Sequence, residues 1–189
     1  MSLSKRLFDI ICASLGIVLT FPLMLLLAFL IFISTGESPL YWSQRVGRYN
    51  TLFSMPKFRS MQQKTPQVAT HLMTDPDAYL TPIGRFLRRT SLDELPQLWS
   101  VLRGEMSFVG PRPALFNQDD LVALRTKAGL HKLVPGITGW AQINGRDSLS
   151  IPEKVSLEEE YLRRQSFTFD LLILWRTFSA TAHHHGIHH

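Results

Sequence analysis

The feature that most constrains this chain is an apolar run near its N-terminus. No charged residue occurs from Ile10 to Ile33, and a helix needs roughly 20 such residues to cross a bilayer. The run is too long for the apolar part of a secretory signal peptide, and no small-residue cleavage site follows it. Residues 1–36 are therefore predicted to form a membrane helix with a basic flank.

Two features of this run bear on its path through the bilayer. Pro22 stands near its middle and removes a backbone hydrogen bond there. Basic residues lie on both sides, so the Lys and Arg excess that marks a cytoplasmic flank gives no direction for a crossing. These residues are Lys5, Arg6, Arg45, Arg48, Lys57 and Arg59. A re-entrant helix broken at Pro22 would place both flanks in the cytoplasm, and a single kinked span is the alternative that the physics leaves open. Lys5 and Arg6 either bind anionic headgroups or act only as a topology flank.

The rest of the 189-residue chain is long enough for one domain with its own core. We expect a cytoplasmic catalytic domain over residues 37–182 and a His-rich tail over residues 183–189. The net charge of +5 and the pI of about 9.7 indicate anionic partners, which include nucleic acid, anionic lipid and phosphorylated substrates. Cys12 is the one cysteine, so the chain forms no internal disulfide.

The stretch from Arg85 to Pro113 concentrates the residues that can do chemistry. Ser91 followed by Glu94 has the spacing of a capping box, and Leu95, Leu98, Trp99 and Leu102 continue at helical spacing up to Gly104. Asp93 and Glu94 would then lie in the first turn, where the helix dipole favours negative charge. Neighbours in a helix diverge by about 100°, so one carboxylate is suited to be a nucleophile and the other a metal ligand or base. Pro96 predicts an irregular start.

Arginines surround these two carboxylates. Arg85, Arg88 and Arg89 precede them, and Arg112 follows between Pro111 and Pro113, where the backbone has little freedom. The planar guanidinium fork suits phosphate oxygens. An ordinary capped helix remains the alternative for the carboxylates taken alone, and the arginines favour a phosphate-handling site.

The other segments predict a mainly α fold with a small β-hairpin. Residues 40–61 read as a hairpin around a turn at residues 47–50, with Lys57 and Arg59 on one face. Residues 62–82 read as a mobile loop beside the site. Helices are expected over residues 117–133, 153–165 and 170–182. The last of these is amphipathic, and it either lies in the headgroup plane or packs as a core helix.

Two motifs make the chain resemble a known family. RRTSLDELPQLWSVLRGEMSFVGPRP and PGITGWAQINGR closely resemble the bacterial sugar transferases, specifically the small monotopic phosphoglycosyl transferases, and the resemblance extends from Lys5 to around Asp170. It implies a re-entrant helix embedded in one leaflet, and amphipathic interfacial helices around a catalytic core at the cytoplasmic face of the bacterial inner membrane. Phe21 stands where many members have Ser, so no hinge role for a hydroxyl is expected. Glu158 stands where Asp is usual.

The resemblance also implies a reaction. Such enzymes transfer a phosphosugar from a nucleoside diphosphate sugar, here expected to be a UDP-sugar, to polyprenol phosphate, and they release UMP in the first membrane step of glycan assembly. Carried onto this sequence, Asp93 attacks the phosphate, and Glu94, with Asp93, holds Mg²⁺. Lys57 and Arg59 match family positions that are expected to contact substrate phosphate, and Arg146 matches a nucleotide-binding position. Arg88 and Arg112 lie near the carboxylates in the sequence and are also expected to bind substrate phosphate.

Two other functions are compatible with parts of this sequence. A polyprenol-phosphate glycosyltransferase would move the sugar alone and release UDP, but no Gly-rich nucleotide fold precedes an Asp-x-Asp motif. A membrane-tethered basic protein that binds nucleic acid or anionic lipid explains the charge, but it gives Asp93 and Glu94 no role, and carboxylates repel a phosphate backbone. Membrane lipids, a UDP-sugar and polyprenol phosphate are therefore the expected partners, and nucleic acid is not.

Overall fold

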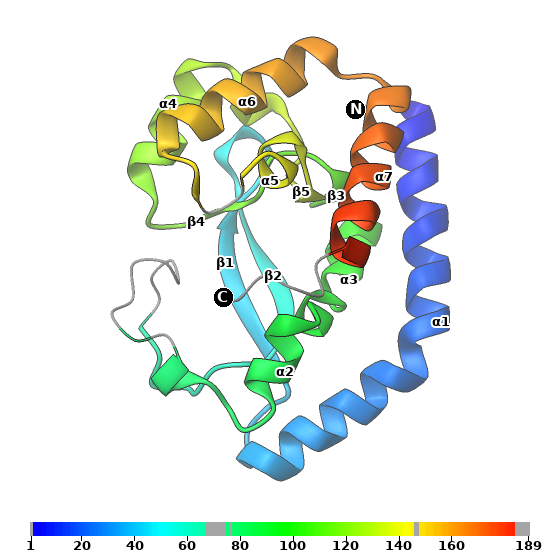
Figure 1. Ribbon diagram of the computed structural model, residues 1–189, viewed down its shortest axis with the longest axis vertical. Helices are drawn as coiled ribbons and strands as arrows, with labels where there is room; N and C mark the ends of the chain where they lie inside the picture. Colours follow the sequence, from blue (N-terminus) through cyan, green and yellow to red (C-terminus); the bar gives the residue numbers. More distant parts are fainter. Residues whose placement is uncertain (1, 67–74, 76, 146–147, 184–189) are drawn as a thin grey trace.

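The fold is mainly helical and contains the predicted small hairpin, and Figure 1 shows one long helix along one side of a mixed α and β domain. The computed structural model describes the chain except for residues 1, 67–74, 76, 146–147 and 184–189. The sequence-based expectations for Arg146, and for most of the loop before Asp77 and of the His-rich tail, lie outside the described residues.

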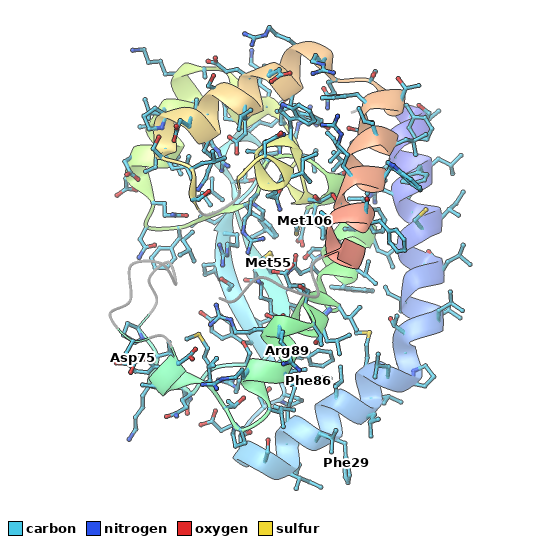
Figure 2. The ribbon with its side chains drawn as sticks, viewed as in Figure 1. Phe29, Met55, Asp75, Phe86, Arg89 and Met106 are labelled. Carbon is cyan, nitrogen blue, oxygen red and sulfur yellow. The ribbon has the colours of Figure 1, made fainter. Side chains whose placement is uncertain are left out.

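Helix α1 (Leu3–Thr35) contains the apolar run. The Ser2 side chain caps its start by accepting from the Lys5 N–H, and Gly36 ends it in the left-handed conformation at φ 68°. The helix is long and apolar enough to cross a membrane, and its most apolar window is only 11% buried in the protein. Figure 2 shows Phe29 on its outer side. A soluble core helix would bury this face, so the apolar surface of α1 is available to lipid.

The middle of α1 combines a proline with a hydroxyl. The helix stays helical through Pro22, and Figure 1 shows that it changes direction part-way along. Thr20 Oγ1 donates to the Gly16 carbonyl at 2.7 Å. Such a bond to the preceding turn bends helices. The expectation that no hydroxyl at position 21 acts as a hinge stays a prediction, and Thr20 supplies a hydroxyl one residue before it.

Strands β1 (Leu40–Val46) and β2 (Leu52–Phe58) confirm the predicted hairpin, with antiparallel pairing from Leu40 opposite Phe58 to Val46 opposite Leu52. Its turn, η1 (Arg48–Asn50), holds Tyr49 and Asn50 at positive φ. Asn50 Nδ2 donates to Thr126 Oγ1 at 3.0 Å, which ties the turn to α4 (Asp119–Lys127). The short strand β4 (Ala114–Leu115) pairs with β1 and completes a three-stranded sheet.

A second sheet was not predicted. Strand β3 (Ser107–Val109) pairs in parallel with β5 (Gly136–Thr138). Each strand has three residues, which is too short to leave a periodic pattern in the sequence. Between the hairpin and β3 lie η3 (Asp77–Tyr79), α2 (Gly84–Arg89), η4 (Leu92–Glu94) and α3 (Gln97–Arg103).

The C-terminal part packs four helical segments around the β3 and β5 sheet. They are η5 (Leu130–Lys132), α5 (Trp140–Ile143), α6 (Ile151–Arg164) and α7 (Phe167–His183). The predicted helix over residues 117–133 is thus shorter and divided into α4 and η5. Helix α6 starts at a capping box between Ser150 and Glu153 that was not predicted from the sequence. Helix α7 buries Phe169 and Ile173 and exposes Leu171, Trp175 and Phe178, so it has both a core face and an apolar outer face.

Three clusters of buried side chains form the interior. The largest joins β3 to the C-terminal helices, and a second joins α1, α3 and the hairpin through Ala13, Val101, Met55 and Met106. Figure 2 shows Met55 and Met106 inside the domain. The third packs Leu27 and Ile31, near the end of α1, on Phe58 of β2 and Leu87 of α2.

The first turns of α1 contact protein instead of facing lipid headgroups. Lys5 is 6% exposed, and its ammonium group pairs with Asp170 Oδ2 of α7 at 2.5 Å. Arg6 donates to the carbonyls of Val101 and Leu102 at 2.6 and 2.5 Å, where it caps the end of α3. Both sequence-based interpretations of this basic pair were incomplete, because a flanking cation close to a folded domain can pair within the protein.

A buried ion pair between α4 and α6 gives a test of stability. Arg125 binds both carboxylate oxygens of Glu158, with Nε 2.7 Å from Oε2. Removal of one partner of such a pair leaves the other charge buried and costs about 3–5 kcal/mol. Glu158→Gln should lower the free energy of unfolding by about this amount, measured by denaturant unfolding in detergent micelles. Asp77→Asn, which alters an exposed pair with Arg85, should change it by less than about 1 kcal/mol. Equal losses in the two variants would contradict the structural role of Glu158.

Candidate active site

Asp93 and Glu94 do not lie in the first turn of a capped helix. They belong to the short 3₁₀ turn η4, and α3 begins only at Gln97, with Pro96 as its N-cap residue. Ser91 adopts a left-handed conformation at φ 55° and makes no capping bond. The predicted capping box was therefore wrong, since Pro96 has no N–H and favours a new helix start after it. The predicted end at Gly104 is confirmed, at φ 81°.

Glu94 is the meeting point of three segments that lie far apart in the sequence. Its Oε1 atom accepts a hydrogen bond from Lys57 Nζ of β2 at 2.9 Å and lies 3.5 Å from Arg112 Nη2. Arg112 follows β3, so the structure brings together the predicted carboxylate and two of the predicted phosphate ligands. The arrangement places two cations beside adjacent carboxylates, which suits an anionic substrate.

Arg45 also lies at this cluster, although the sequence analysis predicted for it only a place in the basic flank of the apolar run. Its Nη1 atom donates to the Pro113 carbonyl at 3.2 Å, and its Nε atom donates to Ser43 Oγ at 2.9 Å. Burial and the nearby charge of Arg112 lower the pKa of Arg45 to about 10. The predicted hairpin could have revealed it, because antiparallel pairing with Phe53 places Arg45 on the same face as Lys57.

The remaining predicted phosphate ligands differ in their placement. Arg59 faces the connection between α1 and β1, where Nε donates to the Ser38 carbonyl at 2.7 Å and Nη1 lies 3.5 Å from Glu37. It is not part of the cluster around Glu94 in this structure. Arg88 contacts Met61 Sδ at 3.7 Å, and its charge also acts on Asp93, so α2 contributes to the site.

Burial shifts the ionisation of the central groups toward their neutral forms. It raises the pKa of Asp93 above the ordinary value of 3.8, an effect that Lys57 and Arg88 oppose. It lowers the pKa of Lys57 below 10.5, which the charge of Glu94 opposes. Charges held away from water interact more strongly than exposed ones. The ionised Asp93 is therefore poorly solvated, as a nucleophilic carboxylate needs to be.

The carboxylates fit Mg²⁺ only if a substrate supplies further ligands. Within the described part of the chain, no three His, Cys, Asp or Glu side chains are grouped to hold a metal ion. Mg²⁺ commonly binds one or two carboxylates and completes its octahedron with waters and substrate phosphates. Asp93 and Glu94 can provide such a partial set.

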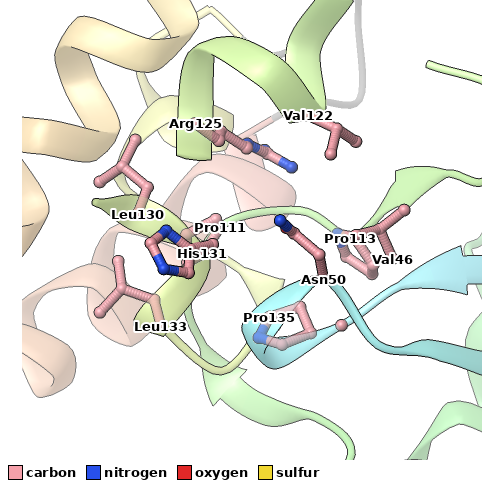
Figure 3. A pocket seen from close by; sticks show the side chains of 11 residues that line it. Val46, Asn50, Pro111, Pro113, Val122, Arg125, Leu130, His131, Leu133 and Pro135 are labelled. Atoms are coloured by element: carbon pink, nitrogen blue, oxygen red, sulfur yellow. The ribbon is translucent and has the colours of Figure 1, made fainter. Parts of the chain in front are cut away.

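A small cavity lies behind the Arg112 segment. Figure 3 shows Pro111 and Pro113 on its wall, with Asn50, Arg125 and His131 around it. Its volume of about 30 Å³ holds roughly one water molecule, so it is too small for a nucleotide sugar. Neither Glu94 nor Arg112 lines this cavity.

The fold and this cluster combine a long apolar helix with a carboxylate that two cations approach, an arrangement that suits an anionic substrate. The model of the family described as bacterial sugar transferase matches residues 1–184. The chain belongs to this family and is a sugar-phosphate transferase.

Individual relatives agree with this membership. The chain is 37% identical over 194 residues to the exopolysaccharide production protein ExoY of Rhizobium meliloti, covering 94% of this chain and 85% of the relative. It is 36% identical over 189 residues to the undecaprenyl-phosphate galactose phosphotransferase of Salmonella typhimurium, and 39% identical over 182 residues to the UDP-glucose:undecaprenyl-phosphate glucose-1-phosphate transferase of Escherichia coli. These two alignments cover 92% and 93% of this chain but only 39% of each relative.

The raised pKa of Asp93 predicts how its replacement affects stability. Because the folded state holds this proton more tightly than the unfolded chain, the ionised carboxylate destabilises the fold as pH rises above 3.8, and fully so above the folded pKa. Asp93→Asn should therefore be at least as stable as wild type at pH 7.5, and the difference should shrink as pH falls toward 3.8. Thermal unfolding in detergent at both pH values measures this. Asp77→Asn, on an exposed side chain, should show no such trend, and a marked loss of stability in Asp93→Asn at pH 7.5 would contradict the reasoning.

Proposed function

We propose that this enzyme transfers a phosphosugar from a UDP-sugar to a polyprenol phosphate, releases UMP, and forms a covalent aspartyl phosphosugar intermediate on Asp93. This would be the first membrane step in the assembly of a glycan. The observation that carries the proposal is the buried carboxylate of Asp93 next to Glu94. Lys57 Nζ lies 2.9 Å and Arg112 Nη2 lies 3.5 Å from Glu94 Oε1.

The chemistry proceeds in two displacements at one phosphorus atom. The Asp93 carboxylate attacks the phosphorus that carries the sugar, the bond from this phosphorus to the bridging oxygen breaks, and UMP leaves with the electron pair. A phosphate oxygen of the lipid then attacks the same phosphorus and displaces Asp93, which gives a polyprenyl diphosphate sugar. Attack on a diphosphate by an anion requires neighbouring positive charge.

Lys57 and Arg112 supply this charge from two directions. In the free enzyme both cations pair with Glu94, and substrate phosphate oxygens would accept from the same N–H donors. Arg45 binds the Pro113 carbonyl and so steadies the segment that bears Arg112. When bound by Glu94 and Asp93, Mg²⁺ would add further charge neutralisation on the diphosphate.

The names of the relatives support the substrates. The Escherichia coli relative is named for UDP-glucose and undecaprenyl phosphate, and the Salmonella typhimurium relative for undecaprenyl phosphate and galactose. A UDP-sugar donor and an undecaprenyl phosphate acceptor are thus the first substrates to try. The Rhizobium meliloti relative is named for exopolysaccharide production, which fits a role in exopolysaccharide synthesis.

The contacts of α1 support a re-entrant path at the cytoplasmic face. Arg6 near its start binds the end of α3, and Leu27 and Ile31 near its end pack on α2 and β2. A spanning helix would carry its two ends to opposite sides of the bilayer, whereas here both ends contact one domain. The exposed Trp175 and Phe178 of α7 would lie in the same leaflet interface.

A mass measurement tests the intermediate. Enzyme quenched with a UDP-sugar in the absence of lipid should gain one phosphosugar on the peptide that contains Asp93. Asp93→Asn keeps the shape of the side chain but removes its charge, so the adduct and UMP release should vanish together. Asp77→Asn should retain both, and Glu94→Gln should be severely impaired.

Other results would change the assignment. An adduct in Asp93→Asn would mean that another residue is the nucleophile. UMP that appears only with lipid present, and no adduct in wild type, would indicate direct attack by polyprenol phosphate. Release of UDP in place of UMP would support the glycosyltransferase alternative.

The path of α1 is tested by cysteine labelling. With Cys12 replaced by Ser, Leu3→Cys and Ser38→Cys place single cysteines on exposed positions near the two ends of the helix. Both should react with an impermeant thiol reagent from the cytoplasmic side. Labelling of the two positions from opposite sides would establish a span instead.

A further inference from the structure

The position of Arg112 depends on a strand of only three residues. Arg112 lies three residues after Val109, the last residue of β3, and two residues before the two-residue strand β4. Strand β5 holds one side of this segment, since Gly110 N–H donates to the Thr138 carbonyl and Gly136 N–H to the Pro111 carbonyl, both at 2.9 Å. Strands this short are not stable alone, so other contacts to β3 decide where Arg112 lies.

Those contacts come from side chains of α1, α6 and α7. Lys5 donates to the Val109 carbonyl at 2.9 Å, and Asp9, one helical turn later, accepts the Phe108 N–H at 3.2 Å. Figure 1 shows α7 running beside the first part of α1, and Asp170 of α7 pairs with Lys5 at 2.5 Å.

Tyr161 of α6 completes the group. Its hydroxyl donates to Asp170 Oδ1 at 2.7 Å and lies 3.4 Å from the Val109 carbonyl. We call the four residues Lys5, Asp9, Tyr161 and Asp170 the β3 clamp.

Burial of the β3 clamp costs solvation free energy that apolar contacts between the helices would not cost. Its members are between 1% and 6% exposed, so one ammonium group, two carboxylates and a phenol are removed from water. Among the described residues, Asp9 Oδ2 has no hydrogen-bond partner. Apolar side chains often stabilise such a position at least as well as a buried ion pair. Hydrogen bonds to β3, unlike apolar contacts, fix the direction and register of its backbone.

We propose that the β3 clamp positions Arg112 for the donor phosphate, which makes α1 part of the framework of the active site. The inference rests on the proposed function of Arg112 as a phosphate ligand. Lys5, Asp9, Tyr161 and Asp170 act through β3 and are positioning residues. A displacement of a catalytic group by about 1 Å can lower turnover by about 100-fold, so even a small shift of β3 should be measurable.

Neighbouring basic residues on α1 provide a matched comparison. Lys5→Met removes the bond to Val109, while Arg6→Met removes bonds to Val101 and Leu102 at the end of α3. Both variants lose one positive charge from the same turn of the same helix. Tyr161→Phe, which removes one hydroxyl from the β3 clamp, serves as a milder variant if Lys5→Met does not fold.

The kinetic test is a double-mutant cycle with Arg112→Ala. UMP release is measured with undecaprenyl phosphate and whichever of UDP-glucose and UDP-galactose the wild type uses. Lys5→Met or Tyr161→Phe should lower kcat by about tenfold or more in the wild-type background, with the KM for undecaprenyl phosphate unchanged. In the Arg112→Ala background the same change should alter kcat by less than about twofold, because its target is already lost. The Arg6→Met loss should instead be equal in both backgrounds. Equal losses from Lys5→Met in both backgrounds would overturn the proposal.

A second measurement does not depend on activity. Hydrogen exchange of the peptide spanning residues 107–112, followed by mass spectrometry in detergent, should be faster in Lys5→Met and Tyr161→Phe and unchanged in Arg6→Met. Equal acceleration in Arg6→Met would indicate a general loosening of α1 and would overturn the proposal. If wild type releases no UMP with either donor, the proposed function fails, and the exchange comparison alone decides whether the β3 clamp holds the Arg112 segment.

Discussion

The pairing of Glu94 with Lys57 and Arg112 is the interaction on which the arrangement of the site depends. It joins η4, β2 and the segment after β3, none of which is long enough to fix its own place. Each of these segments is in turn held by an element that packs on α1. The Lys57 strand ends at Phe58, which contacts Ile31, and Arg112 follows a strand whose carbonyl binds Lys5. The long apolar helix and the charged cluster are therefore parts of one structure.

This cluster holds its charges at a cost in solvation. Burial moves the pKa of Asp93 upward and those of Lys57 and Arg45 downward, which means that water would stabilise all three ions better than the protein does. Such a site is prepared for a charged substrate before the substrate arrives, since the dipoles and charges need little rearrangement. The free energy for this preparation comes from the apolar packing around it.

Long periodic or strongly punctuated segments could be predicted from the sequence, and short ones could not. The apolar run gave α1, the alternation around residues 47–50 gave the hairpin, and Gly104 marked the end of α3, because each reflects a local rule. The capping box failed at Ser91 since a following proline overrode a local pattern. Strands β3 and β5 carry only three residues each, and they pack against α7, with further hydrogen bonds from α1 to β3. The residues Asp93, Glu94, Lys57 and Arg112, which residue type and family resemblance singled out, lie close together in the structure. Arg59 instead faces the connection between α1 and β1. Arg45 and the internal role of Lys5 were missed, because both depend on partners more than 60 residues away.

Both ends of α1 pack against the domain, so the helix and the domain cannot be treated as separable parts. Ala13 packs in one cluster with Val101 and Met106, and Leu27 packs in another with Leu87. Removal of the helix would therefore expose these buried side chains and would not leave an intact domain. A version cut after Gly36 would lose the partners of Asp170 and Phe108 together with this apolar cover. The helix is therefore not a detachable tether, and a water-soluble catalytic fragment cannot be obtained by trimming it away. Solubility would have to be engineered on its exposed apolar side, with the inner face left as it is.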